Sequence, residues 1–433
     1  MSSLLGIYYL APWLRYDRGP LVPDQAILID MPNRRAYFFF IEIWPQEVYY
    51  LSAILIFAAV ALFFATSLFG RVWCGYACPQ TVWTDLFIWV ERIFQGRRND
   101  RIKLDNAPLS WNKIWRKSAT HFTWILISLA TGGAWVFYFN DAPTLFNQII
   151  HLDVPLNVAS WIYALTCSTY LMAGYAREQV CMYMCPYSRF QSAMFDKDSL
   201  IISYDETRGE PRGKLKAKGC GDCIDCGKCV IVCPQGIDIR NGLQMECIAC
   251  GLCIDACNSV MDKIGKPRGL VRYDTTRNLN YRKKGIQEKV RILRPRTIYY
   301  SIILAAVGIL ILYNLLNRNI LELHVIADRN PLFVQLSNGD IRNGYIVKIL
   351  NKTHKDKVFA LEIDGLEEHQ ITVQNALDLK ANYLPVYADS VGQFRIFLTS
   401  EKQNTARTKV KFTITDKIDK NQAVYNGTFI SDN

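Results

Sequence analysis

Long runs of apolar residues without a charged side chain recur along the chain. They lie at residues 48–69, 119–139, 154–176 and 297–316. Each has about the 20 residues that an α-helix needs to cross the hydrocarbon core of a bilayer. The pattern therefore predicts an integral membrane protein with at least four spans. Residues 3–14 are apolar but too short to span, and we interpret them as an interfacial segment or as the remnant of a further span.

After the last apolar run, the pattern of apolar and polar positions changes to period two. Alternating segments such as 332–341, 344–353 and 408–416 are separated by turn signals, for example Ser337-Asn338-Gly339-Asp340. About seven or eight such strands predict a β-sandwich of the immunoglobulin type. Residues 317–433 contain no cysteine, so no disulfide staples this domain. We expect it to serve as a binding or docking module.

The placement of charge orients the predicted spans. The formal net charge is +11, yet residues 140–156 contain no Lys or Arg. In contrast, residues 91–117 contain Arg92, Arg97, Arg98, Arg101, Lys103, Lys113, Arg116 and Lys117. Cytoplasmic loops concentrate Lys and Arg. We therefore expect 91–117 and 196–296 on the cytoplasmic side of the membrane, and 140–156 and 317–433 on the opposite side. Surplus basic charge also suits nucleic acid, but these residues flank apolar spans, so we predict no nucleic-acid partner.

Nine of the fourteen cysteines lie within residues 220–257. Two runs with the spacing Cys-x2-Cys-x2-Cys-x3-Cys follow one another, as in bacterial ferredoxins with two clusters. In that pattern three close thiolates bind one cluster and the fourth reaches the other. We therefore predict one 4Fe–4S cluster on Cys223, Cys226, Cys229 and Cys257, and a second on Cys247, Cys250, Cys253 and Cys233. A zinc ribbon on Cys220-x2-Cys223 and Cys247-x2-Cys250 needs only four cysteines and leaves the others unexplained. We interpret Cys220 as a spare thiol near the first cluster, because the set of eight ligands is complete without it.

A second set of cysteines shares a Cys-x-Tyr-x-Cys-Pro core. The two cores begin at Cys74 and Cys181, and each follows a predicted span and precedes an aromatic segment. This indicates an internal repeat about a pseudo-two-fold axis. At a spacing of four, both cysteines of a core share one face of a helical turn, and the proline behind them bends or ends the helix. The alternative is simple packing of buried cysteines, to which we assign Cys167.

Two matched pairs indicate a metal or redox role for Cys74, Cys78, Cys181 and Cys185. Thiolates are soft ligands that suit Cu(I), zinc or iron–sulfur clusters. Met182 and Met184 beside the second pair favour copper, and a third cluster is the alternative. Only one histidine, His121, lies in a predicted span, which argues against a bis-histidine haem. We expect His121 to face the bundle interior, and no Gly-rich phosphate loop is evident.

These segments together resemble one family. Residues 73–83 (WCGYACPQTVW), 177–196, 221–257 and 267–273 (PRGLVRY) look like parts of the cytochrome c oxidase accessory proteins called CcoG, FixG or RdxA. The family consists of membrane polyferredoxins needed to assemble the cbb-three type haem–copper oxidase. The resemblance implies that the eight cysteines of the ferredoxin pattern are cluster ligands. It also matches Cys74, Cys78, Cys181 and Cys185 to the family's CxxxCP cysteines.

The resemblance further implies an oxidoreductase that reduces Cu(II) to Cu(I) for the oxidase, with copper at the four CxxxCP cysteines. An unknown cytoplasmic protein would donate the electrons, and the oxidase or its copper-delivery factors would be the partners. One alternative is a general membrane ferredoxin subunit that exchanges electrons with quinol or a partner reductase. Another is a non-enzymatic scaffold for oxidase assembly.

The expected organisation is that of a multi-domain membrane protein. An α-helical transmembrane bundle of four to five spans occupies residues 1–200, completed by a last transmembrane helix at 297–316. An inserted two-cluster ferredoxin-like α+β module and its basic connector occupy 201–296, and the immunoglobulin-like sandwich occupies 317–433. Members of the family usually begin with a full span, whereas this chain begins with only about twelve apolar residues.

Overall fold

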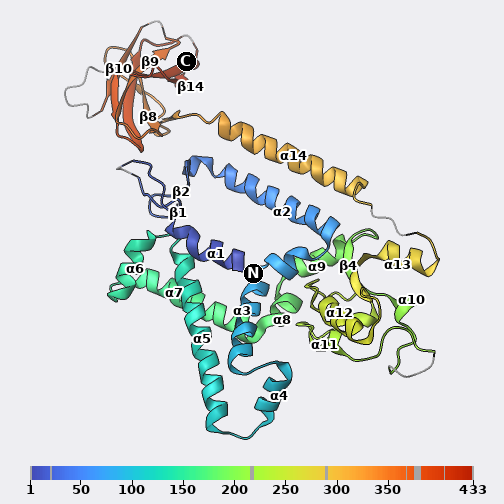
Figure 1. The fold of residues 1–433 in the computed structure, drawn as a ribbon. Helices are drawn as coiled ribbons and strands as arrows, with labels where there is room; N and C mark the ends of the chain where they lie inside the picture. The colour runs from blue at the N-terminus through green and yellow to red at the C-terminus, as the bar shows by residue number, and fades with distance from the viewer. Residues whose placement is uncertain are drawn as a thin grey trace. The chain divides into compact units, whose positions relative to one another are not determined.

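The computed structural model describes residues 2–19, 22–214, 219–287, 291–366, 368–374, 382–403 and 405–431. The chain divides into two compact units. One consists of Met1–Asp17 and Asp24–Leu312, and the other of Arg18–Pro23 and Tyr313–Asn433. Figure 1 shows the order of their elements. All fourteen cysteines belong to the first unit.

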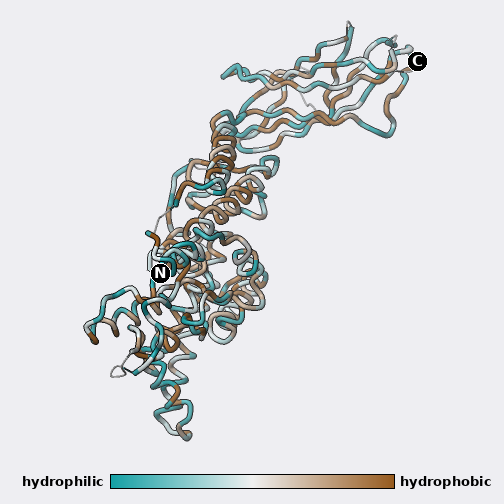
Figure 2. Tube along the Cα trace, turned by 90° about the vertical axis from the view of Figure 1, so that its right-hand side faces the viewer, coloured by the Kyte–Doolittle hydropathy of each residue, from teal (hydrophilic) through white to brown (hydrophobic). Residues whose placement is uncertain are grey.

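In the described part of the chain, two helices are long and apolar enough to cross a membrane. One is Pro45–Phe69, which contains α2 (Tyr49–Phe69), and the other is α14 (Pro295–Leu316). The most apolar 18-residue stretches of the two helices have mean hydropathies of 2.4 and 2.0. Only 11% of the first stretch and 0% of the second are buried in protein. Brown marks such hydrophobic residues in Figure 2. A bilayer supplies the apolar surroundings that these exposed side chains require.

The second and third apolar runs form helices of a different kind. The second lies in α5 (Trp111–Val136), which begins with charged residues. The third forms α7 (Leu156–Thr169) and continues as the π-helix η4 (Tyr170–Ala176). Neither is among the long apolar helices just named, so the bundle of four to five spans stays a prediction. The two helices pack closely, since a Cβ on Gly132 of α5 would lie 2.9 Å from the carbonyl oxygen of Ile162 in α7.

Shorter elements complete the helical part of the first unit. They are α1 (Ser2–Leu10), α3 (Pro79–Phe94), α4 (Arg98–Asn106), α6 (Ala142–Ile150), α8 (Arg177–Gln179), α9 (Pro186–Met194) and a small antiparallel sheet of β1 (Ile27–Asp30), β2 (Arg35–Phe38) and β3 (Ile41–Ile43). The aromatic segment behind the first cysteine core is therefore helical. Phe87 of α3 stacks on Trp124 of α5 with ring centroids 5.1 Å apart, which fixes α3 across the bundle.

The ferredoxin-like module is closed by its own two-stranded sheet. Strand β4 (Leu200–Tyr204) pairs antiparallel with β5 (Val271–Thr275), so the two ends of the module meet. Between and after them lie α10 (Glu206–Gly209), α11 (Lys228–Ile231), η6 (Ile239–Asn241), α12 (Leu252–Ile264) and α13 (Thr276–Lys283). Gly227 and Gly251, both with positive φ, cap the N-termini of α11 and α12, and each directly follows the second cysteine of its run. This α+β module agrees with the sequence prediction.

The second unit is a β-sandwich. One sheet has the order β10-β12-β8-β6 with β7 also paired to β8, and the other has the order β11-β9-β13-β14. The strands are β6 (Leu321–Ala327), β7 (Val334–Gln335), β8 (Ile341–Asn351), β9 (Lys357–Asp364), β10 (His369–Val373), β11 (Tyr383–Val386), β12 (Ser390–Ser400), β13 (Arg407–Asp416) and β14 (Gln422–Ile430). Across the core, the rings of Tyr345 and Phe412 meet edge to face at 5.0 Å.

The period-two pattern predicted most of these strands, but it overestimated one and missed another. The central strand β8 buries alternate residues, as its sequence predicts. The segment 332–341, expected to be a full strand, contributes the two residues of β7 and the first residue of β8. Strand β6, which follows the last apolar helix and pairs with β8, was missed.

Candidate redox and metal centres

Both cysteine cores of the second set fold into the same unusual turn. Residues Trp73–Ala77 form the π-helix η3, and Val180–Met184 form the π-helix η5. In each, the backbone N–H of the second cysteine donates to a carbonyl five residues earlier at 2.8 Å. The spacing of four suggested an ordinary helical turn, and the structure corrects this to a π-turn. Single π-turns are rare and frequent at functional sites.

The repeat extends to the residues around each turn. Thr81 donates its hydroxyl hydrogen to the carbonyl of Cys74 at 2.6 Å, and Ser188 does the same to Cys181 at 2.7 Å. In both halves the bond joins residues seven apart. Four residues before each first cysteine the backbone has positive φ, at Gly70 (61°) and at Arg177 (37°). Side-chain contacts and backbone angles therefore repeat together, as the internal repeat requires.

The two turns bring their four thiols into one electrostatic neighbourhood. Burial raises the pKa of Cys74 to about 12, and the nearby thiols of Cys78, Cys181 and Cys185 raise it further, whereas Arg71 lowers it. Burial also raises the pKa of Cys181 to about 11; Cys78, Cys185 and Glu178 raise it further, and Arg71 lowers it. The Cys74 thiol donates to Oε1 of the buried Gln191 at 3.2 Å. Thiolates here require a positively charged partner, and a bound metal ion or cluster supplies one.

The distances between the cysteine sulfurs limit the kind of metal site that they can form. The structure describes every cysteine of the chain, and no three of their Sγ atoms lie within 4.8 Å of one another. Three thiolates on one tetrahedral ion, with metal–sulfur bonds of about 2.3 Å, bring their sulfurs to roughly 3.8 Å. The donor set of soft thiolates fits copper or an iron–sulfur group, and its present spacing is wider than a three-thiolate single-ion site.

The ferredoxin-like module groups its cysteines around two small cavities. One is lined by Cys233, Cys247, Cys250 and Cys253, and the other by Cys223, Cys226, Cys229 and Cys257. Cys229 borders both cavities. The fourth cysteine of each run thus lies with the first three of the other. Burial raises the pKa of Cys253 to about 12 and of Cys257 to about 11.

These groupings fit the two predicted ligand sets, each with four soft donors in a largely enclosed site, while the assignment of individual ligands stays a prediction. Cys220 lines neither cavity, and Cys167 lies in α7. Both therefore lie apart from the predicted ligand cavities.

One cysteine turn lies directly against the loop of the second cysteine run. A Cβ on Gly75 would come within 2.8 Å of the Ile248 carbonyl oxygen and 3.0 Å of that of Ala249. The hydroxyl of Tyr76 donates to the Cys250 carbonyl at 3.1 Å and lies 3.0 Å from the hydroxyl of Tyr273. The turn and the loop between Cys247 and Cys250 are therefore in van der Waals contact.

Arg71 connects the segments on both sides of this contact by hydrogen bonds. Its buried guanidinium donates to the carbonyls of Met245 and Cys247, the latter at 3.2 Å. It also donates to the Ser188 carbonyl at 2.9 Å, behind the second cysteine turn. One side chain thus joins both cysteine turns and the ferredoxin-like module. Sequence reasoning missed Arg71, although it stands three residues before Cys74, and it missed the partnership of Tyr76 with Tyr273.

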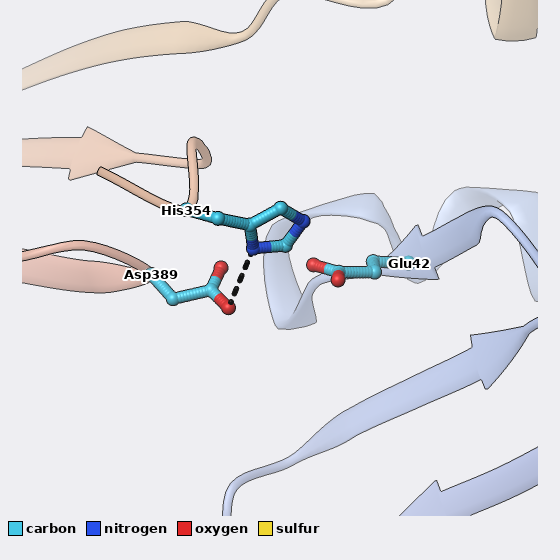
Figure 3. A group of neighbouring side chains, drawn as sticks. All are labelled: Glu42, His354 and Asp389. Atoms are coloured by element: carbon cyan, nitrogen blue, oxygen red, sulfur yellow. Dashed lines mark hydrogen bonds and ion pairs between the residues drawn. The ribbon is translucent and has the colours of Figure 1, made fainter. Parts of the chain in front are cut away.

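The histidines do not join the cysteines. Nδ1 of His121 lies 3.1 Å from the Tyr170 hydroxyl, and its ring meets Trp124 edge to face, so it faces other helices as expected. In the β-sandwich, Nδ1 of His354 lies 3.3 Å from Oδ2 of Asp389, as Figure 3 shows. That bond joins two loops of the second unit.

Comparison with known proteins agrees with this architecture. Residues 176–276 match a family described as a 4Fe-4S dicluster domain, and residues 51–98 match one described as a 4Fe-4S binding domain. Residues 311–432 match the IG-like fold at the C-terminus of FixG. The nitrogen fixation protein FixG of Rhizobium meliloti is 45% identical, with 96% of this chain and 86% of the relative covered.

The chain belongs to the FixG/RdxA family. Protein RdxA of Cereibacter sphaeroides is 46% identical, with 92% of this chain and 85% of RdxA covered. Protein RdxB of the same organism is 49% identical, with 86% of this chain and 81% of RdxB covered. With its dicluster domain and apolar helices, this FixG/RdxA protein is an iron–sulfur electron-transfer protein of the membrane.

Proposed function

We propose that this FixG/RdxA-family protein reduces Cu(II) to Cu(I) at the paired cysteine turns, Cys74/Cys78 and Cys181/Cys185. The observation that carries the proposal is the contact between η3 and the loop from Cys247 to Cys250. Through Gly75 and Tyr76, one cysteine turn touches the backbone beside two predicted cluster ligands. The clusters, when bound, supply one-electron transfer at this contact.

The proposed reaction balances with one electron and no proton. Cu(II) gains the electron and becomes Cu(I), and a cytoplasmic flavoprotein or ferredoxin supplies it. Soft thiolates bind Cu(I) in preference to Cu(II), so they favour the reduced ion. Arg71 lowers the pKa of both Cys74 and Cys181, but burial prevails and holds the two values at about 12 and 11. The thiols would therefore lose their protons when the metal binds and not in the electron-transfer step.

Exposure supports a direction for electron flow. Cys226, which lines the cavity of Cys223, Cys229 and Cys257, is exposed, which suits entry from a docked donor. Cys247 and Cys250 line the other cavity, and η3 lies against the loop between these two cysteines. Electrons would therefore enter near Cys226 and leave beside Gly75.

The proposal includes a location and a purpose. The ferredoxin module would face the cytoplasm and the β-sandwich the periplasm of a bacterial inner membrane, with several spans between them. Cu(I) would serve a cbb-three type cytochrome c oxidase or its copper-delivery factors. Family membership, two apolar helices and the basic segment 91–117 support this part of the proposal.

The Cys74→Ser/Cys78→Ser variant tests the copper site. The protein is reduced with dithionite, freed of excess reductant without oxygen, and mixed with Cu(II) and a Cu(I)-selective chelator. We expect Cu(I) formation to fall at least tenfold, by roughly the 1.4 kcal/mol or more that a tenfold loss represents. Cys167→Ser, in α7, is the matched control. A variant with unchanged iron content and full Cu(I) formation would contradict the assignment.

A third 4Fe–4S cluster is the second candidate for the same four cysteines. It is favoured by the wide spacing of their sulfurs and by the 4Fe-4S binding family that matches residues 51–98, which include Cys74 and Cys78. The protein would then pass electrons on to a partner as a membrane ferredoxin. Anaerobically purified protein should contain about eight irons per chain with two clusters and about twelve with three. The Cys74→Ser/Cys78→Ser variant should lose about four irons only in the second case.

A further inference from the structure

A cavity of about 1000 Å³ lies within the first unit, beside the contact just described. Its walls come from η3, α3, α4 and α8 on one side and from α11, α12 and the second cysteine run on the other. Gly75 and Tyr76 border it, as do Cys181, Cys233 and Cys250. A molecule in this cavity would touch a cysteine turn and two predicted ligands of the second cluster at once.

The cavity is large enough for a small-molecule complex. Ligand pockets commonly enclose roughly 300 to 1000 Å³. A bare metal ion needs far less room, and the cysteine-lined cavities of the module are much smaller. The volume therefore suits a metal ion that arrives with its ligand.

One end of the cavity is rich in arginine. Arg92 at the end of α3 and Arg97, Arg98 and Arg101 at the start of α4 line it together with Arg177. Arg101 and Arg177 share one carboxylate, since both pair with the buried Glu91. In the described part of the chain, the guanidinium groups of Arg92 and Arg98 have no ion pair. Glu91 thus offsets part of the charge of Arg101 and Arg177, whereas among the described residues no ion pair offsets the charge of Arg92 and Arg98.

The cysteine end has the opposite character. Glu178 stands three residues before Cys181, Asp255 follows Cys253 by two residues, and both carboxylates belong to the cavity wall. Asp85, halfway along α3, is the third acidic residue of the wall. Because α3 has 16 residues at about 1.5 Å each, roughly 24 Å separate its ends. Thiols and carboxylates suit a metal cation at one end, and guanidinium groups suit an anion at the other.

We propose that this cavity binds copper as an anionic chelate, with the metal towards Cys181 and the carboxylate or thiolate ligand against Arg92 and Arg98. The inference rests on the proposed function and names its substrate class. The reduced protein gives one electron to the bound Cu(II), which becomes Cu(I), and the only bonds that break are those between copper and its ligand. Hydrated Cu(II), a free cation, is repelled by the arginine end.

The test compares two copper complexes on the full chain in nanodiscs of neutral lipid. The protein is reduced, freed of reductant and mixed with Cu(II)–citrate, which is anionic, or with Cu(II)–ethylenediamine, which is cationic. Oxidation of the clusters is followed by visible absorption. Each variant is compared with the wild type for the same complex, so the different potentials of the complexes cancel.

In the Arg92→Gln/Arg98→Gln variant, we expect the half-saturating concentration of Cu(II)–citrate to rise roughly tenfold. That of Cu(II)–ethylenediamine should stay the same or fall. The Arg116→Gln variant is the matched control, because Arg116 in α5 does not line the cavity. Binding of redox-inert Zn(II)–citrate, measured by equilibrium dialysis, should weaken in parallel.

The outcomes separate the two proposals. Absence of cluster oxidation by either copper complex in the wild type contradicts the proposed function. Oxidation that is equally strong in the arginine variant contradicts the cavity assignment alone. The arginine variant could instead lose its binding to vesicles of anionic lipid while its half-saturating concentration of Cu(II)–citrate stays unchanged. That result would also overturn the assignment and would show that the arginines bind the membrane surface.

Discussion

Gly75 determines how closely the first cysteine turn approaches the ferredoxin-like module. A Cβ at this position would meet the backbone oxygen of Ile248 at 2.8 Å, and backbone cannot move aside as a flexible side chain can. The turn or the loop from Cys247 to Cys250 must shift by several tenths of an ångström. A single methyl group can therefore test whether the contact carries electrons.

We predict that Gly75→Ala slows copper-dependent oxidation of the clusters several-fold with both clusters retained. The clash should cost about 1–3 kcal/mol of contact free energy, as overpacking does elsewhere. The rate is measured in a single turnover by visible absorption, with iron content as the check on the clusters. Gly133→Ala in α5 is the matched control, since a Cβ there meets nothing within 4 Å. Equal rates in both variants would mean that this contact does not limit transfer.

At the scale of single residues, sequence reasoning found the cysteines but not what holds them. The repeated Cys-x-Tyr-x-Cys-Pro core marked all four thiols of the paired turns. Arg71 and Gln191 carry no such signal, because their roles depend on partners more than 100 positions away. Contacts between distant segments have no period in the sequence and appear only in the folded chain.

At the scale of elements, periodicity predicted the type of most segments and missed their irregularities. The alternation in β8 and the helical segment behind Cys78 are both present. The π-turns were missed, because one extra residue per turn leaves the cysteine spacing of four unchanged. The extended conformation of Cys78 and Cys185, each followed by a helix that starts at proline, ends the π-turn in both halves. Strand β6 was missed because it follows directly on an apolar helix.

The long apolar runs show that composition alone does not predict which helices span a membrane. All four runs are helical for much of their length. Among the described helices, however, only those that contain α2 and α14 are both long enough and apolar enough to cross a membrane. The third run passes from α7 into the π-helix η4 at Tyr170. A run without charge therefore predicts helix more securely than it predicts a straight span.

At the scale of the whole molecule, the two units are stabilised in different ways. The sandwich has an apolar core of its own, in which Tyr345, Phe359 and Phe412 are almost completely buried. The core of the ferredoxin-like module instead includes Cys223 and Cys229, whose sulfurs are predicted cluster ligands. Removal of iron should therefore leave the core of the sandwich intact and take from the ferredoxin-like module the groups around which it packs.

We predict that oxidative removal of iron with a chelator unfolds the module but not the sandwich. Hydrogen exchange should speed up by at least tenfold in α12, β4 and β5, because thiols left without metal in a largely enclosed site no longer cross-link the cysteine runs. Amides of β8, β12 and β13, which pair in the two sheets, should keep their protection. Mass spectrometry of peptides from the same sample reports both, so each unit is the control for the other. Joint loss of protection in both would show that the sandwich depends on the clusters, and unchanged exchange in α12 would show that the module packs without them.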